Sequence, residues 1–254
     1  MDVARLAMTL ADAVRAGTAI PPLTDEVDLS VEQAYEVQDA TLELLDPGGS
    51  HDVVKLGLTS RAKQEQMGVD EPLYGRFVSG AALDLGDTLD TGALIQPRVE
   101  PEIAFLLGEE LAGPGVTALH VLAATRAVMP ALDVLDSRFA GYRFTLPDVV
   151  ADDASAARYL VGAPVSATGI DLATVGCVFE RNGELVDTAA GAAVLGHPAA
   201  AVAWFVRKLA ERGRVVPAGT LVLAGSLTAA VPVAPGDSVR ITVDRIGSVE
   251  LACT

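Results

Sequence analysis

The sequence predicts an α+β protein in which a β-rich core of mixed strands carries helices on its outside. Apolar residues follow helical spacing in the first 50 residues, and short apolar runs separated by turn residues predominate after His51. The 254 residues, 50% of them hydrophobic, suffice to bury one large core. We therefore expect a helical N-terminal layer over residues 1–50. A β-rich domain that carries the chemistry should span residues 51–254, as one structural unit with that layer.

The N-terminal segment predicts two helices. Apolar residues recur every three or four positions from Val3 to Val14, and Gly17 follows, where a helix can end. Ser30 and Gln33 have the spacing of a capping box, which predicts a second helix running to about Leu45.

The middle of the chain predicts alternating strands and helices. The apolar run over residues 53–58 predicts a buried strand, and Ser60 caps a short helix through Met67. Residues 99–107 predict a strand, residues 117–128 a helix, and residues 129–135 a further strand.

The C-terminal part predicts a hairpin, one helix and a closely spaced set of strands. Residues 181–184 contain Asn-Gly between two apolar runs, a hairpin signal. Pro198 follows His197 at a favoured first-turn position of a helix to about Arg212, and Gly213 comes just past its end. The final strands are predicted over residues 220–224, 230–233, 239–243 and 248–252, with turns between them.

Composition narrows the possible functions. The net charge of −16 and the lack of a basic stripe argue against nucleic-acid binding. No apolar run approaches the ~20 residues of a membrane helix, and we see no signal peptide at the start. The two cysteines, Cys177 and Cys253, lack metal-site spacing, so we expect a cytoplasmic protein.

An acidic pair inside an apolar run points to a metal. Glu100 and Glu102 stand two apart on a predicted strand, so their carboxylates share one face, and Asp133 lies in a second apolar run. Convergent carboxylates in apolar surroundings need a positive partner, and oxygen ligands suit Mg²⁺ or Mn²⁺. The alternative is an exposed strand edge with two solvated glutamates.

Lys55 is the second unusual residue. It is embedded in the apolar run over residues 53–58, where an unpaired ammonium is costly. Its cation suits a carboxylate or a developing enolate. The alternative is a structural ion pair with an acid of the core. Lys63 and Lys208 stand on predicted helices, where we expect solvated side chains.

Taken in order, several motifs resemble the fumarylacetoacetate hydrolase superfamily, in the branch that acts on 2-oxo- and 2-hydroxydienoates. The matching motifs occupy residues 55–60, 66–69, 97–105, 136–138, 149–152, 191–198 and 229–237. The resemblance implies a β-roll like the C-terminal domain of that family, and a divalent metal cofactor.

The resemblance also implies roles for individual residues. The family's metal ligands fall on Glu100, Glu102 and Asp133, and its active-site lysine falls on Lys55. The third ligand is usually Glu, so Asp133 is one methylene shorter. The usual Asn after Asp152 is also replaced, by Asp153, which adds negative charge near the site.

Five further positions match the substrate pocket of the family: Leu73, Tyr74, Arg138, Asp152 and Ser155. Arg138 is equally compatible with a structural role. An aliphatic residue before Tyr-Gly, as in Leu73-Tyr74-Gly75, is typical of the decarboxylases of this branch, whereas the hydratases carry an acid there. We expect apolar Leu73 to lie near the departing carboxylate and to withhold solvation from it.

The function implied by the resemblance is metal-dependent decarboxylation of 2-oxohex-3-enedioate to 2-hydroxypenta-2,4-dienoate, in meta-cleavage degradation of aromatic compounds. One alternative is hydration of that dienoate to 4-hydroxy-2-oxopentanoate, and another is a non-catalytic assembly partner of such an enzyme. The resemblance further implies a homo-oligomer and a complex with the sister hydratase. No G-x-G-x-x-G motif follows a strand and no nucleophile elbow is present, so we expect no nucleotide cofactor and no serine nucleophile.

Overall fold

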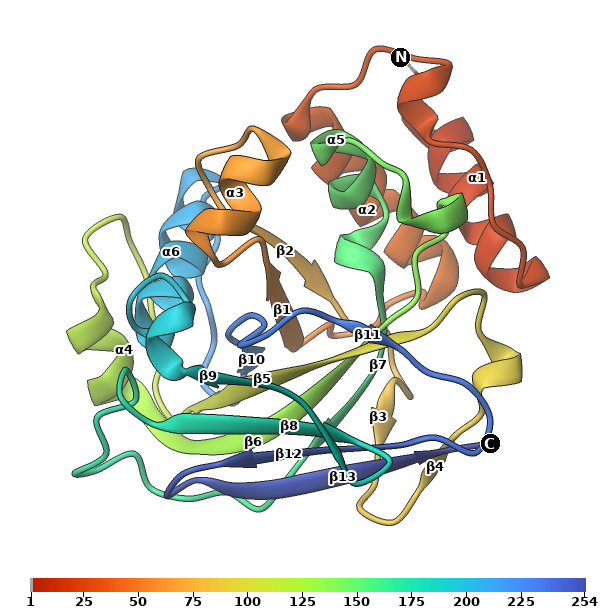
Figure 1. Cartoon of the computed structure of the whole chain (residues 1–254). Helices are drawn as coiled ribbons and strands as arrows, with labels where there is room; N and C mark the ends of the chain where they lie inside the picture. The colour runs from red at the N-terminus through yellow and green to blue at the C-terminus, as the bar shows by residue number, and fades with distance from the viewer. Residues whose placement is uncertain (1) are drawn as a thin grey trace.

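Two β-sheets dominate the protein, whose computed structural model describes residues 2–254, apart from the side chains of Gln66 and Met67 (Figure 1). The larger sheet has eight strands in the order β2-β1-β10-β5-β6-β7-β3, with β11 paired to β5. It contains parallel and antiparallel pairs, which confirms the predicted mixed-sheet core. Its strands are β1 (Val53–Gly57), β2 (Leu73–Arg76), β3 (Ala82–Leu83), β5 (Arg98–Leu107), β6 (Thr125–Leu135), β7 (Ala156–Val161), β10 (Leu221–Leu223) and β11 (Val231–Pro232).

The smaller sheet has five strands in the order β4-β13-β12-β8-β9 and packs against the larger one through β6. Its strands are β4 (Thr88–Leu89), β8 (Gly176–Arg181), β9 (Glu184–Ala190), β12 (Ser238–Val243) and β13 (Gly247–Cys253). Phe105 and Leu132 of the larger sheet share one buried apolar cluster with Phe179 and Ile241 of the smaller sheet. Burial of this cluster holds the two layers together.

The predicted hairpin and the closely spaced C-terminal strands are confirmed. Asn182 and Gly183 connect β8 to β9 with φ of 56° and 78°, and this left-handed pair gives the twist that a tight hairpin needs. The strands β10 to β13 lie where the apolar runs of the sequence predicted them.

The two N-terminal helices are also confirmed. α1 (Val3–Ala16) ends at Gly17, which has a φ of 59°, and α2 (Val31–Leu45) begins with the capping box of Ser30 and Gln33. Both helices pack outside the larger sheet, in contact with each other, and α2 also contacts α5 (Leu146–Ala151) (Figure 1).

The other helices flank the sheet ends. Ser60 caps α3 (Arg61–Met67) as predicted, and α6 (Pro198–Glu211) begins after His197, whose Nδ1 accepts from the Ala199 N–H at 3.0 Å. α6 packs on β1 and on α4 (Ala118–Ala124). Short 3₁₀ turns occupy Leu23–Asp25, Thr91–Ala93, Ala140–Tyr142, Asp153–Ser155 and Gly191–Ala193.

The predicted helix over residues 117–128 is wrong in its second half. α4 ends at Ala124, and β6 begins at once with Thr125. Val128 lies opposite Phe105 in the ladder with β5 and is fully buried there. β-branched residues favour a strand when a partner strand is present, and that partner is distant in sequence. Pairing with β5 therefore decides the conformation of this segment.

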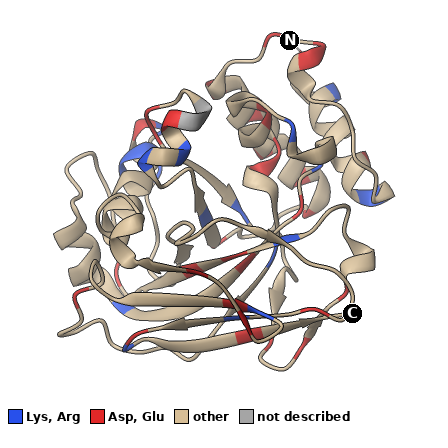
Figure 2. Cartoon of the chain, viewed as in Figure 1, with Lys and Arg blue, Asp and Glu red and all other residues tan. Residues whose placement is uncertain are grey.

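Charge is distributed without a basic face in the view of Figure 2, where Lys and Arg are scattered among more numerous Asp and Glu. Among the described residues, no helix combines the length and apolar character that crossing a bilayer requires.

Candidate active site

Three carboxylates converge on one face of the larger sheet. Glu100 and Glu102 project from β5, and Asp133 on β6 stands directly opposite Glu100 in the antiparallel ladder. One oxygen from each of the three lies within 4.8 Å of the others. Glu100 is 6% exposed, and Glu102 and Asp133 are fully buried, so the exposed-edge alternative for the acidic pair is excluded. The predicted face-sharing of the two glutamates follows from strand alternation.

The electrostatics of this cluster call for a cation. Burial, followed by the charges of Asp133 and Glu100, raises the pKa of Glu102 well above its usual range. Burial also raises the pKa of Asp133 to about 6. Glu102 Oε1 and Asp133 Oδ1 are buried without a hydrogen-bond donor among the described residues. Orphaned carboxylate oxygens that converge in this way match the ligand set of a hard divalent ion, so the residues fit Mg²⁺ or Mn²⁺.

A backbone contact orients the central ligand. The Gly225 N–H donates to Glu102 Oε2 at 2.6 Å, which leaves Oε1 directed elsewhere. Gly225 has a φ of 109°, and a Cβ at this position would collide with the Thr59 side chain. Only glycine therefore brings this N–H to the carboxylate.

Lys55 lies in the same cluster. Its side chain is 1% exposed, and its ammonium forms an ion pair with Asp133 Oδ2. Burial opposes the charged form of Lys55, but Asp133, Glu100 and Glu102 together outweigh that cost and raise its pKa. The ammonium is therefore charged while it contacts a candidate metal ligand.

A cavity of about 490 Å³ opens above this cluster. Its walls include Lys55 and Leu73 from β1 and β2, Val149 from α5, and Ser155. The residues that complete the lining are Gly57, Leu58, Lys63, Arg98, Glu100, Leu135, Tyr142, Phe144, Ala154, Ala229 and Ala230. The structure thus brings Lys55, Leu73 and Ser155 to one cavity, and their roles toward a substrate stay predictions.

A left-handed turn presents Ser155 to the cavity. Asp153, Ala154 and Ser155 have φ of 54°, 54° and 57°, a conformation that three successive non-glycine residues rarely share. Gly75 allows the turn to pack against β2, because a Cβ there would collide with the Asp153 carbonyl. Backbone strain of this kind is often retained where a side chain must be aimed.

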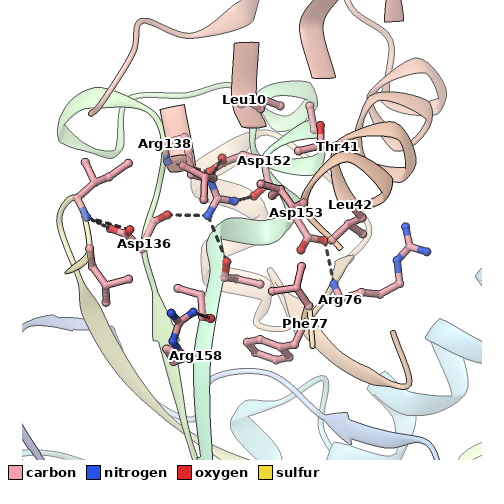
Figure 3. Close-up of a pocket in the computed structure, with 18 of the residues that line it drawn as sticks. Leu10, Thr41, Leu42, Arg76, Phe77, Asp136, Arg138, Asp152, Asp153 and Arg158 are labelled. Atoms are coloured by element: carbon pink, nitrogen blue, oxygen red, sulfur yellow. Dashed lines mark hydrogen bonds and ion pairs between the residues drawn. The ribbon is translucent and has the colours of Figure 1, made fainter. Parts of the chain in front are cut away.

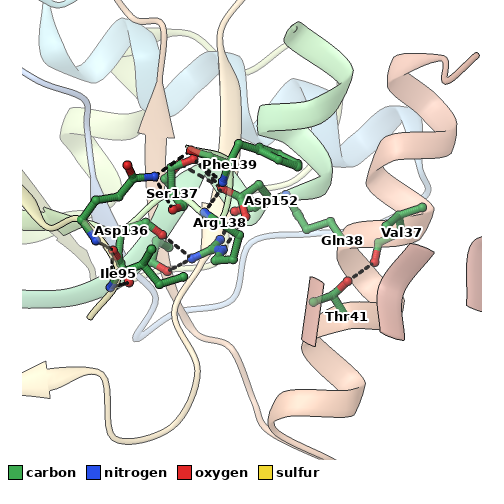
Figure 4. Close-up of polar contacts among 12 residues, drawn as sticks. Val37, Gln38, Thr41, Ile95, Asp136, Ser137, Arg138, Phe139 and Asp152 are labelled. Carbon is green, nitrogen blue, oxygen red and sulfur yellow. Dashed lines mark hydrogen bonds and ion pairs between the residues drawn. The ribbon is translucent and has the colours of Figure 1, made fainter. Parts of the chain in front are cut away.

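Arg138 and Asp152 do not line the cavity above the metal cluster. They line a neighbouring cavity of about 120 Å³, drawn in Figure 3. Arg138 forms an ion pair with Asp152 and donates to the carbonyl of Asp136 at 2.9 Å. Figure 4 shows that Ser137 and Arg138 converge on the Asp152 carboxylate, which also accepts from Ser155 Oγ at 3.1 Å. Asp152 is therefore connected to the site by its hydrogen bond with Ser155, and Arg138 is connected to it through Asp152.

Tyr74 and Asp153 do not line the cavity above the metal cluster. Tyr74 is fully buried on the other side of β2, stacked on Tyr35 at 4.6 Å between ring centres. Asp153 Oδ1 accepts from the Arg76 N–H at 2.8 Å, and burial raises the pKa of Asp153 to about 7.

Sequence reasoning missed three polar residues of the cavity wall. The Lys63 side chain is 38% exposed, in keeping with the expected solvation, and its ammonium also lies 3.7 Å from Glu100 Oε2. The Arg98 guanidinium stacks on the Tyr142 ring, 4.0 Å from its centre, and both residues line the cavity. One signal was available for Arg98, because it precedes Glu100 by two positions and so shares its strand face. Tyr142 has no such signal, since it arrives from a loop distant in sequence.

Comparison with known proteins gives consistent matches. The family model "Fumarylacetoacetate (FAA) hydrolase C-terminal" matches residues 61–252. A 4-oxalocrotonate decarboxylase from Pseudomonas sp. (strain CF600) is 44% identical over 233 residues, covering 91% of this chain and 88% of that protein. A 2-keto-4-pentenoate hydratase from Paraburkholderia xenovorans (strain LB400) is 39% identical over 246 residues, covering 96% and 91%. Among solved structures, 4-oxalocrotonate decarboxylase from Pseudomonas putida G7, complexed with magnesium and adipate, superposes with a TM-score of 0.95 at 39% identity, covering 99% of this chain and 97% of that one.

Proposed function

Because the chain belongs to the fumarylacetoacetate hydrolase family, we propose that it decarboxylates 2-oxohex-3-enedioate to 2-hydroxypenta-2,4-dienoate with a bound Mg²⁺ or Mn²⁺. This places it in the meta-cleavage degradation of aromatic compounds. The observation that carries the proposal is the buried set of Glu100, Glu102, Asp133 and Lys55 beneath a cavity large enough for a small dicarboxylate. The magnesium and adipate in the P. putida G7 decarboxylase support it.

Glu100, Glu102 and Asp133 would hold the metal, with their orphaned oxygens as ligands. When bound, a divalent ion polarises the 2-oxo group and offsets the charge of the carboxylates. Asp133 would have a second role, because its Oδ2 keeps the Lys55 ammonium at the edge of the cluster. The site residues all belong to residues 51–254, to which we assign the chemistry, whereas α1 and α2 cover the outside.

Lys55 would stabilise the charge that develops in the reaction. As the bond between C5 and C6 breaks, its electron pair forms the C4–C5 double bond, the C3–C4 double bond moves to C2–C3, and negative charge reaches the C2 oxygen. A buried ammonium within reach of that oxygen stabilises the resulting dienolate, and protonation of the oxygen then gives the dienol. No group has to abstract a proton from carbon in this step.

Leu73 separates the decarboxylase from the hydratase alternative. Hydration requires an acid or base beside the diene carbons, whereas Leu73 supplies an apolar side chain to the cavity, at a position where the family resemblance implies an acid in hydratases. The hydratase stays a second candidate because the P. xenovorans hydratase covers nearly the whole chain at 39% identity.

Ser155 is proposed to position the substrate, with Asp152 and Arg138 fixing its turn from behind. Tyr74 is proposed to act indirectly, because its packing holds β2 so that the neighbouring Leu73 faces the cavity.

One assay tests the function. The protein is incubated with Mg²⁺ and, separately, with 2-oxohex-3-enedioate and 2-hydroxypenta-2,4-dienoate. We expect CO₂ release from the first substrate and no hydration of the second. Formation of 4-hydroxy-2-oxopentanoate without CO₂ release would favour the hydratase, and no turnover of either would favour a non-catalytic assembly partner.

We also propose that the chain associates with a sister hydratase, because the dienol product is unstable in water, and that it forms a homo-oligomer, as the family resemblance implies. Light scattering of the protein alone and mixed with such a hydratase tests both points. A cytoplasmic location is proposed from Cys177 and Cys253, which are both buried and free.

A further inference from the structure

Arg98 has no carboxylate partner in the described part of the chain, although the protein is strongly acidic. No hydrogen bond or ion pair of its guanidinium occurs within residues 2–254, and it is half-buried at the cavity wall. Its contact is the ring of Tyr142, 4.0 Å away. Asp136, an acid whose charge acts on Tyr142, accepts instead from the Ile95 and Gln96 N–H groups at 2.9 and 2.7 Å, as Figure 4 shows in part. Arg98 is thus held in place by a ring and keeps its donors for another group.

Strand geometry places Arg98 within reach of a metal-bound substrate. Arg98 and Glu100 share one face of β5, and their Cα atoms are two residues, or about 6.6 Å, apart. An extended chain of six carbons has a similar span of roughly 6 Å, since each C–C bond is ~1.5 Å long. A six-carbon diacid with its oxo-acid end at the metal cluster therefore reaches the Arg98 wall.

The charge of the cavity is matched to a dianion. A divalent ion together with Lys55 offsets the three ionised carboxylates of the cluster. Lys63 and Arg98 are the two further cations among the residues that line the cavity, so two negative charges on a ligand bring the site to neutrality. Lys63 already contacts Glu100 at 3.7 Å, next to the metal cluster, whereas the Arg98 guanidinium contacts only the Tyr142 ring among the described residues.

From this arrangement we propose that Arg98, oriented by Tyr142, binds the distal carboxylate of the substrate and makes the site selective for dicarboxylates. The inference rests on the proposed function and deepens it. Leu73 lines the same cavity as Arg98, from strand β2, on the far side of β1 and β10 from β5. Leu73 gives this cavity an apolar wall, and its place next to the departing carboxylate stays a prediction.

The chemistry gives Arg98 a role in capture rather than in bond cleavage. An ion pair stabilises the carboxylate of the bound substrate, and the departing CO₂ is neutral, so the contact does not strengthen in the transition state. Loss of the guanidinium should therefore raise KM and leave kcat unchanged or slightly higher.

The test compares two acids that share the metal-binding end. Titration calorimetry of the Mg²⁺-loaded protein measures Kd for 2-oxohexanedioate and for 2-oxohexanoate, which lacks the distal carboxylate. We expect the parent to prefer the diacid by about 10-fold to 100-fold, the range of a charge-assisted hydrogen bond. Arg98→Met should bring the ratio close to one, with Kd for 2-oxohexanoate unchanged.

Further variants make the test specific. Arg98→Lys keeps the charge but loses the planar stack, and should recover part of the preference. Arg240→Met, at an exposed position of β12, is the matched control and should behave as the parent.

Preserved preference in Arg98→Met, or its loss in Lys63→Met alone, would overturn the inference. Weak binding of both acids by the folded, metal-loaded parent would instead defeat the proposed function, and the inference with it. If Arg98→Met does not fold, a comparison of the parent with Arg98→Lys decides whether the inference holds. An intact preference for the diacid and an unchanged KM in Arg98→Lys would contradict a role for the planar guanidinium.

Discussion

The Lys55 ammonium and the Asp133 carboxylate form an ion pair at the bottom of the cavity, with both side chains buried. From the sequence, a structural ion pair was the alternative to a role of Lys55 in the reaction, and Asp133 was assigned to the metal. The geometry joins the two roles, because one oxygen of Asp133 holds Lys55 and the other is left for a cation.

Glu102→Gln should remove metal binding. The variant replaces an anionic oxygen ligand by an amide in a fully buried position, so we expect Mg²⁺ affinity to fall at least ~10-fold and turnover to be nearly abolished. Calorimetry with Mg²⁺ and the CO₂ assay measure the two effects. Glu250→Gln, on an exposed position of β13, is the control. Full activity of Glu102→Gln after chelator treatment would place the metal elsewhere.

Asp133→Glu should be tolerated, whereas Asp133→Ala should not. The longer side chain keeps both the ligand oxygen and the pairing with Lys55, but Ala leaves a buried ammonium without its nearest partner. Mg²⁺ affinity and thermal stability are measured for both variants. Equal metal affinity of the Ala variant and the parent would remove Asp133 from the ligand set.

Lys55→Met should bind Mg²⁺ and lose turnover by about 10²-fold or more, the scale of one strong electrostatic contact in a dry site. Met fills the space of the buried stem, so the variant is expected to fold, and Lys55→Ala should lose turnover similarly. Circular dichroism, calorimetry and the CO₂ assay distinguish the roles. Unfolding of both variants would return Lys55 to a purely structural ion pair.

Metal binding should strengthen as pH rises through about 6. The pKa of Asp133 is raised to about 6, mainly by burial, and that of Glu102 is raised further, so protons occupy the ligands at lower pH and compete with the ion. The increase in melting temperature on adding Mg²⁺ should therefore be larger at pH 7.5 than at pH 5. An increase independent of pH would show that these carboxylates do not bind the ion.

Asp153→Asn should stabilise the protein at neutral pH. Burial raises the folded-state pKa of Asp153 from 3.8 to about 7, so the folded state holds a proton that the unfolded chain has lost. The parent therefore loses stability relative to the variant as pH rises from about 4 to about 7, by at most ~1.4 kcal/mol per pH unit. Asn keeps an oxygen for the Arg76 N–H. Urea unfolding at pH 5, 6, 7 and 8 measures the difference, and a constant gap would contradict the raised pKa.

Features encoded locally were predictable from the sequence. The capping box of Ser30 and Gln33, and the Asn182-Gly183 turn, each depend on residues a few positions apart, and both appear as expected. The pairing of Glu100 and Glu102 on one face follows from strand alternation in the same way.

Features that depend on distant partners were harder to predict. The start of β6 at Thr125 is decided by pairing with β5, and no local signal overrides the helical pattern before it. Arg138 and Asp152 match family positions, yet their ion pair lies behind Ser155 and not in the cavity above the metal cluster. The stacking of Arg98 on Tyr142 joins a strand to a distant loop, so only the fold brings them together.

The cross-strand position of Glu100 and Asp133 has a consequence for insertions and deletions. Residues between β5 and β6, from 108 to 124, can change in number without moving either carboxylate, because the altered length is absorbed beyond the ends of the ladder. One residue added between 102 and 107, or between 125 and 131, forces the ladder either to bulge or to slip by one position. A slip turns one carboxylate to the opposite face and separates it from the other. Length variation among homologues should therefore be frequent in the first segment and absent from the other two.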